Sequence, residues 1–135
     1  MTTVSTIREG EISALDTFTA LTGANGDSTN NAVSVPPKVS SIRTIRVSTA
    51  QTGATAGAGS FNMKFTGDGL DVQQMFTVGG WVNVGTETST GNNNAVTEIA
   101  CNIPVNTNGI ISIFGGFAGS ADAGDASMCV ELMFQ

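Results

Sequence analysis

Strict alternation of apolar and polar side chains limits this chain to β-structure. In Phe61-Asn62-Met63-Lys64-Phe65-Thr66, large apolar residues take turns with polar ones, which is the period of a strand with one buried face. Residues 126–134 repeat the pattern, and their predicted inward side chains are Met128, Val130, Leu132 and Phe134. No helix long enough for a parallel crossover is visible in the sequence. The alternation therefore predicts an all-β protein.

Four more segments are predicted strands because they are rich in Val, Ile, Thr or Phe: residues 39–49, 73–84, 95–105 and 110–117. Residues 6–21 have apolar side chains at every third position from Ile12 to Leu21, but Thr17 and Thr19 favour extended backbone. This segment is predicted to be a strand or an arm. Turn-forming residues predict loops at 22–38, 50–60, 67–72, 85–94 and 118–125.

About seven to eight short strands in 135 residues predict one antiparallel β-sandwich, jelly-roll-like in its organisation. The single domain is expected to span residues 1–135, with residues 1–21 as an N-terminal arm or the first strand. Asn108-Gly109 is the strongest local turn signal, because both residues tolerate the positive φ of a two-residue type I′ turn. A hairpin over residues 95–117 would place Ile103 opposite Phe114.

The residue inventory argues against an enzyme. The chain has no His and no Tyr, so it lacks the side chain that most readily exchanges a proton near neutral pH and most often binds metals. Lys64 is expected to lie on a solvated strand face and not to act as a catalytic amine. The Gly-rich stretch 52–59 lacks the Lys-Ser/Thr pair of a phosphate loop. No catalytic residue, cofactor, metal or small-molecule substrate is predicted.

Charge argues against a nucleic-acid surface. The five basic residues all lie before residue 65, and the net charge is −6, whereas duplex binding needs clustered Lys and Arg. The chain also lacks an apolar run of membrane-spanning length and the pattern of a secretory signal. Neither direct nucleic-acid binding nor membrane insertion is expected, and synthesis is expected in a cytoplasm.

Two groups of residues are predicted to form an interface. Gly79 and Gly80 precede the single Trp81, and they allow close approach of another backbone to a side chain that is common in interfaces. The alternative role of Trp81 is to fill the sandwich core. Arg43 and Arg46 would face opposite sides of a regular strand, and each is expected to pair with a carboxylate of the acidic C-terminal part, within the chain or across an interface.

The two cysteines are expected to remain free thiols. Alternation places Cys101 on the core face with Ile99 and Ile103, whereas Cys129 shares the opposite face with Ser127 and Glu131. A disulfide needs Cβ atoms that are close and face each other. These two thiols are predicted to point apart.

A compact, His-free β-domain that starts Met1-Thr-Thr-Val and ends Met128-Cys-Val-Glu-Leu-Met-Phe-Gln135 resembles small virus coat or capsid-decoration proteins in its general style. The resemblance implies a non-enzymatic structural protein that self-assembles or joins other capsid proteins in the virion. The absence of a basic arm favours a shell or decoration role over genome binding.

The alternative function is a glycan- or receptor-binding module that uses loops 85–94 and 118–125. Calcium would stabilise it through Asp122 and Asp125. Asp68 and Asp71 form a similar pair, for which turn formation is the simpler explanation.

Overall fold

The computed structural model describes residues 4–12, 18–23, 31–54, 57–83, 91–119 and 125–135. These residues form strands and connections only, and none of them belongs to a helix that could span a membrane. The strands are β1 (Val4–Ile12), β2 (Phe18–Ala20), β3 (Ala32–Ser34), β4 (Ser41–Ala54), β5 (Gly57–Thr66), β6 (Gln74–Asn83), β7 (Gly91–Pro104), β8 (Ile110–Gly119) and β9 (Asp125–Phe134).

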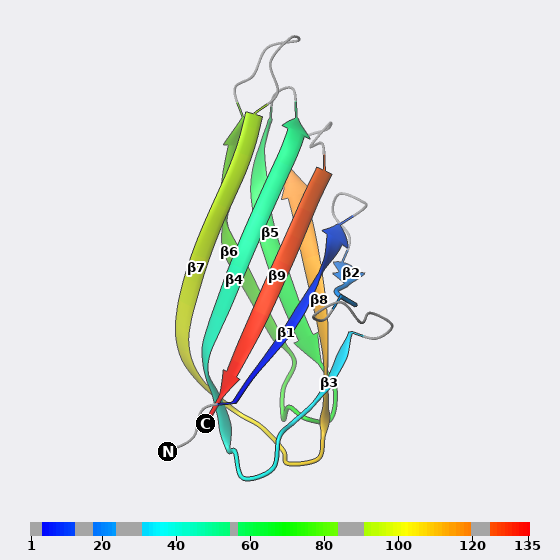
Figure 1. Cartoon of the computed structure of the whole chain (residues 1–135), viewed down its shortest axis with the longest axis vertical. Coiled ribbons are helices and arrows are strands. Elements are labelled where there is room, and N and C mark those ends of the chain that lie inside the picture. Colours follow the sequence, from blue (N-terminus) through cyan, green and yellow to red (C-terminus); the bar gives the residue numbers. More distant parts are fainter. Residues whose placement is uncertain (1–3, 13–17, 24–30, 55–56, 84–90, 120–124) are drawn as a thin grey trace.

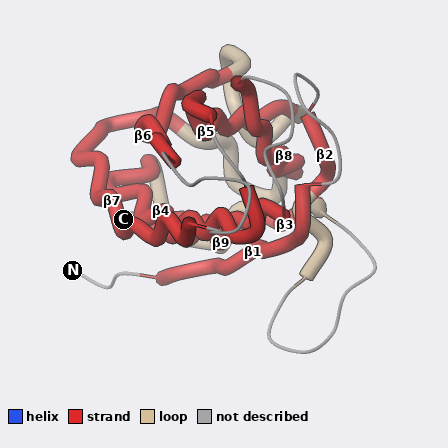
Figure 2. Tube along the Cα trace, turned by 90° about the horizontal axis from the view of Figure 1, so that it is seen from above, coloured by secondary structure: helices blue, strands red, loops and turns tan. Residues whose placement is uncertain are grey.

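Two antiparallel sheets face each other (Figures 1 and 2). The first sheet has the order β1-β9-β4-β7, and the second has the order β2-β8-β5-β6. β3 pairs with β8 beyond β2, so β2 and β3 act as two parts of one strand. The chain then has eight strands, four in each sheet, and this order is that of a jelly roll. The predicted all-β, jelly-roll-like sandwich is confirmed.

The core lies between the sheets and follows the alternation in the sequence. β5 contributes Phe61, Met63 and Phe65, each at most 2% exposed. From the facing sheet, β9 contributes the four predicted inward residues, Met128, Val130, Leu132 and Phe134, each at most 1% exposed. Burial of these side chains is the main favourable contribution to folding of such a sandwich.

The predicted hairpin over residues 95–117 is wrong. β7 pairs with β4 and β8 pairs with β5, so the two strands belong to different sheets. Ile103 lies opposite Ile42, and Phe114 lies opposite Lys64. Asn108 does adopt a positive φ of 67°, but Gly109 does not, and a type I′ turn needs both. The turn closes with the Gly109 N–H donating to Asn106 O at 3.0 Å, and the chain crosses from one sheet to the other.

Several strands begin or end away from their predicted bounds. β4 continues to Ala54 and β5 begins at Gly57, through most of a segment predicted to be a loop. β7 begins at Gly91, because Gly91 to Asn94 pair with the far end of β4. Backbone pairing with a long neighbour overrides the turn preference of Gly, Asn and Thr, since ladder hydrogen bonds need no particular side chain. β3, also within a predicted loop, is held by the same kind of pairing with β8.

The two sheets are joined at the β1 edge. Glu9 of β1 and Gly23, which follows β2, exchange backbone hydrogen bonds of 2.8 and 2.7 Å. The guanidinium of the preceding residue, Arg8, donates to Ala32 O of β3 at 2.8 Å. Residues 6–21 thus contain two strands, one in each sheet, and Figure 2 shows β1 running past β9 toward β2 and β3.

Candidate interaction surfaces

Arg43 and Arg46 lie on the same face of β4, contrary to the prediction of opposite faces. The prediction assumed a regular strand, but the register shifts between Ile42 and Thr44. Arg43 is an extra residue relative to β9, whereas Cys101 and Asn102 of β7 together oppose it. Ile42 and Ile45 are therefore both buried, and both arginines are exposed on the outer face of the first sheet. Bulges of this kind redirect side chains.

Arg46 forms an ion pair within the chain. Its Nε lies 3.2 Å from Glu98 Oε1 on β7, and the two side chains are 51% and 57% exposed. Glu131 of β9 is its partner on the other side in the strand register. An exposed ion pair of this type contributes about 0.2–1 kcal/mol to the free energy of unfolding. The expected pairing with a C-terminal carboxylate is confirmed for Arg46 as an intramolecular contact.

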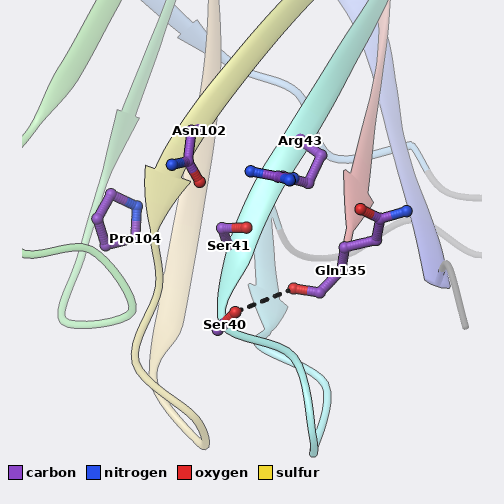
Figure 3. A pocket seen from close by; sticks show the side chains of 6 residues that line it. All are labelled: Ser40, Ser41, Arg43, Asn102, Pro104 and Gln135. Atoms are coloured by element: carbon purple, nitrogen blue, oxygen red, sulfur yellow. Dashed lines mark hydrogen bonds between the residues drawn. The ribbon is translucent and has the colours of Figure 1, made fainter. Parts of the chain in front are cut away.

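Arg43 differs from Arg46 because no hydrogen bond or ion pair joins it to another residue of the described part of the chain. It lines a cavity of about 240 Å³ at one end of the first sheet, the Arg43 pocket, whose residues are Ser40, Ser41, Arg43, Asn102, Pro104 and Gln135. Figure 3 shows Arg43 extending from β4 toward Asn102 on β7, with Ser41 nearby. None of the described residues that line this pocket has an acidic side chain.

The cysteines lie as predicted. Cys101 packs against the core with Ile99, and its Sγ donates to Ile42 O at 3.4 Å. Cys129 faces outward between Glu9 of β1 and Ser48 of β4. Both thiols are free. Burial raises the pKa of Cys101, partly offset by the charge of Arg43, while burial and then the carboxylates of Glu9 and Glu131 raise the pKa of Cys129.

The outer face of the second sheet carries an aromatic cluster around Lys64. The Lys64 Nζ lies 4.7 Å from the centroid of the Phe18 ring and 4.8 Å from that of Phe114. Met75, 59% exposed, is the register partner of Lys64 on β6. We call these four residues, Phe18, Lys64, Met75 and Phe114, the aromatic face. Lys64 is thus not a simple solvated side chain. Each of its two cation–π contacts stabilises this position of the ammonium group by about 0.5–1 kcal/mol.

Gly116 leaves room for this arrangement. A Cβ on Gly116 would lie 3.1 Å from two ring carbons of Phe18, which is closer than ordinary van der Waals contact. The ring can therefore lie over the backbone of β8, and 37% of Phe18 remains exposed.

The aromatic face was not predicted. Phe114 was expected opposite Ile103, although alternation from the buried Ile111 and Ile113 places Phe114 on the other face of β8. Phe18 could not be placed, because the predicted segment 6–21 had no register. Its pairing with Gly116 of β8 supplies that register.

The glycines before Trp81 lie in β6, next to a second register shift. Gly79 pairs with Phe61, whereas Thr77 pairs with Asn62, so Val78 is an extra residue. Trp81 is opposite Gly59 in the backbone register. Its side chain lies outside the described part of the structure, and its contact role stays a prediction.

The proposed calcium ligands are divided between described and undescribed residues. Asp122 and most of loops 85–94 and 118–125 lie outside the described residues. Asp68 and Asp71 hold the β5–β6 turn against the β7–β8 turn: Asp68 Oδ1 accepts from the Ile110 N–H at 2.7 Å, and Asp71 Oδ1 accepts from Asn106 Nδ2 at 3.0 Å. Among the described residues, no three His, Cys, Asp or Glu side chains form a metal-binding group.

Comparison with known proteins gives resemblances in structure and none in sequence. No family model matches the chain, and no curated protein matches its sequence. One of the solved structures that resemble it is the crystal structure of the STIV MCP, a major capsid protein, with 19% sequence identity and a TM-score of 0.34. The match covers 96% of this chain and 48% of the capsid protein, so this chain spans about half the length of that protein.

Proposed function

We propose that this protein is a non-enzymatic structural subunit that assembles, with copies of itself or with other capsid proteins, into a virion coat or onto its surface. The jelly-roll strand order supports this role, because shells of many viruses are built from that fold. Lectin domains and cupins share the fold, so the topology alone does not decide the function. The absence of His from the chain disfavours the metal-dependent chemistry that a jelly roll can host.

The observation that carries the proposal is the aromatic face. Phe18 and Met75 are large apolar side chains that stay 37% and 59% exposed on the outside of a sheet. Grouped apolar exposure of this kind marks contact surfaces of soluble proteins. Lys64 between the two rings adds one fixed positive charge to a chain of net charge −6, which suits contact with an acidic copy.

The predicted contact residues Gly79, Gly80, Trp81, Arg43 and Arg46 belong to the same proposal. β6 carries the first three and is an edge strand of the sheet that bears the aromatic face. A partner that contacts this edge strand would also contact Trp81, and β6 would not need to change its backbone conformation. Direct binding of nucleic acid, membrane or small-molecule substrate has no part in this function.

Light scattering over a wide concentration range, with electron microscopy of the same fractions, tests the proposal. The wild-type protein is expected to form defined oligomers or shells. Phe18→Ser and Met75→Ser are expected to weaken assembly, because each removes apolar contact area. Val96→Ser is the matched control, since Val96 is 66% exposed on the other sheet.

A wild-type protein that stays monomeric at every concentration, alone and with candidate capsid partners, would refute the assembly role. Equal weakening by all three variants would place the contact elsewhere than the aromatic face. Circular dichroism of each variant separates loss of assembly from loss of fold.

A further inference from the structure

We propose that the aromatic face of one copy of this protein binds the outer face of β1 and β9 on a second copy. The inference rests on the proposed assembly function and deepens it, because it names the partner surface and the symmetry of the contact. We call the second surface the acidic patch, and its residues are Ile7, Glu9, Cys129, Glu131 and Met133. The two surfaces belong to different sheets and lie on opposite sides of the molecule (Figure 2).

Strand register brings the residues of the acidic patch together. β1 pairs with β9 so that Ile7 lies opposite Glu131. Two residues along, Glu9 lies opposite Cys129. These positions alternate with the buried Val130 of β9, so their side chains point out of the sandwich. Glu9 is exposed, and no ion pair joins either carboxylate to another described residue. The patch therefore presents two carboxylates among apolar side chains.

The neighbouring charges leave the acidic patch negative. On the outer face of the first sheet, the described basic residues are Arg43 and Arg46, and both belong to β4. Arg46 is already held in an ion pair with β7. Burial and then the carboxylates of Glu9 and Glu131 raise the pKa of the Cys129 thiol, and no described cation offsets them. A positive group is therefore attracted to the β1 and β9 half of this sheet.

The aromatic face has the opposite charge. Among the described strand residues on the outer face of the second sheet, Lys64 is the one charged side chain. Its Nζ lies 4.7 and 4.8 Å from the centroids of the Phe18 and Phe114 rings. Because the rings already hold the ammonium group in place, it loses little conformational entropy when it meets a carboxylate.

Two aromatic faces do not suit each other. A two-fold contact between them would place the Lys64 ammonium groups of both copies in one interface, with no described carboxylate on either face. Like charges across an interface cost free energy. The acidic patch supplies the missing carboxylates, and its Ile7 and Met133 supply apolar area for the rings. The contact is therefore heterologous, and each copy uses both surfaces.

The placement of the two surfaces sets the product of assembly. Because they lie on opposite sides of the sandwich, a copy bound through one surface still offers the other. A heterologous contact closes into a ring if the rotation between copies closes, and otherwise continues as an open array. Both products extend beyond a dimer, which is what a coat subunit requires.

Sedimentation equilibrium of charge-reversal variants at low ionic strength tests the contact. Lys64→Glu and Glu9→Lys are each expected to raise the dissociation constant about tenfold, because each places like charges in the contact. The protein with both substitutions restores the pair in reverse and is expected to recover most of that loss. Val96→Lys is the control, since Val96 is exposed on β7, at the other edge of the sheet from β1.

Glu131→Lys provides a second pairing with Lys64→Glu if circular dichroism shows that Glu9→Lys disturbs the fold. Failure of both doubly substituted proteins to recover association would overturn the inference. A contact between two aromatic faces would also overturn it: Glu9→Lys would then leave association unchanged, and a mixture of wild type and Lys64→Glu would associate more tightly than either alone.

The inference and the proposed function fail in different ways. Wild-type assembly that is insensitive to both Glu9→Lys and Glu131→Lys would overturn this contact and leave the structural role in place. Assembly only with another capsid protein would do the same. A wild-type protein that is monomeric alone and with candidate capsid partners would overturn both.

Discussion

The pKa of the Cys129 thiol is set by burial and by two neighbouring carboxylates. It lies on the outer face of β9 with Glu9 opposite it on β1 and Glu131 two residues along its own strand. Burial, then Glu9, then Glu131, raise the pKa of the thiol above its ordinary value of 9.0. Because the thiolate is the reactive form, this thiol is protected from alkylation at neutral pH.

We expect Glu9→Gln to speed alkylation of Cys129 by iodoacetamide at pH 8, since the substitution removes a negative charge that disfavours the thiolate. The measurement is intact mass against time, with peptide mapping to separate Cys129 from Cys101. Glu98→Gln is the control, because Glu98 does not contribute to the raised pKa of Cys129. An unchanged rate in Glu9→Gln would show that the carboxylate does not act on the thiol.

The same raised pKa values link stability to pH. In the unfolded chain both thiols ionise near 9.0, whereas the folded protein holds them protonated to higher pH. The unfolded state therefore loses protons first, and the free energy of unfolding should fall as pH rises above about 9. Urea denaturation between pH 7 and 10 of wild type and of a Cys101→Ala, Cys129→Ala protein measures this fall. A fall of equal size in the protein without cysteines would assign it to other groups.

The Arg46–Glu98 ion pair should add little to stability. With side chains 51% and 57% exposed, the coupling free energy from a double-mutant cycle of Arg46→Gln and Glu98→Gln is expected to be about 0.2–1 kcal/mol, and smaller in 1 M salt. Urea denaturation supplies the four unfolding free energies. A coupling several times larger, or one insensitive to salt, would mean that Glu131 and Arg46 form a wider charge network with Glu98.

At the scale of elements, two turns at one end of the sandwich interlock. The β5–β6 turn holds Gly67 at a φ of 115°, and Gly69 donates to Ile110 O at 2.9 Å. A Cβ on Gly109 would lie 2.7 Å from the Gly69 backbone nitrogen. The turn between β7 and β8 thus closes against the turn between β5 and β6, which ties the two sheets together.

Gly109→Ala is expected to lower the free energy of unfolding by about 1–3 kcal/mol, because the added methyl group must displace backbone. Chemical denaturation measures the change. Thr107→Ala, an exposed substitution in the same turn, should stay within about 0.5 kcal/mol of wild type. Equal stability of the Gly109→Ala protein would mean that the turns separate without cost.

This interlock explains why the sequence predicted the strands better than their partners. Burial of alternate side chains is a local pattern, so the six clear strands and the inward faces of β5 and β9 could be read directly. The turn at Asn108-Gly109 also forms, but whether a turn joins neighbours in one sheet or crosses to the other depends on the contacts of Gly109 and Ile110 with Gly69. Gly69 comes from a distant part of the sequence.

The candidate sites were harder to predict for a related reason. A bulge at Arg43 depends on the registers with β7 and β9 and leaves no local signature, so the two arginines were predicted on opposite faces of the strand. Phe18 and Lys64 are far apart in sequence and meet only through β8. The ion pair of Arg46, by contrast, follows from the abundance of carboxylates in the C-terminal part of the chain.

At the scale of the whole molecule, both sheets contribute to one core. Phe65 of the second sheet and Leu132 of the first are each 0% exposed and belong to the same hydrophobic cluster. A sheet that separated from its partner would expose its own half of that cluster to water. The single-domain prediction for residues 1–135 therefore leads to a test of cooperativity.

We expect one unfolding transition in urea, with coincident midpoints by far-UV circular dichroism and by fluorescence of the single Trp81. Phe65→Ala and Leu132→Ala should each lower the unfolding free energy by about 2–5 kcal/mol and move both midpoints together. A variant that shifts one probe and leaves the other in place would show that the two sheets unfold separately.

The division of one strand between β2 and β3 sets where the chain can vary in length. The backbone of Ile113 serves both parts: its carbonyl accepts from the Leu21 N–H, and its own N–H donates to Asn31 O, each at 3.1 Å. Backbone pairing along β8 therefore passes from the β2 segment to the β3 segment at a single residue, Ile113. Because pairing on either side is set by β8, residues added or deleted between Gly23 and Asn31 would leave the pairing of the described strands unchanged. New sequence could be inserted there while the two sheets keep their pairing.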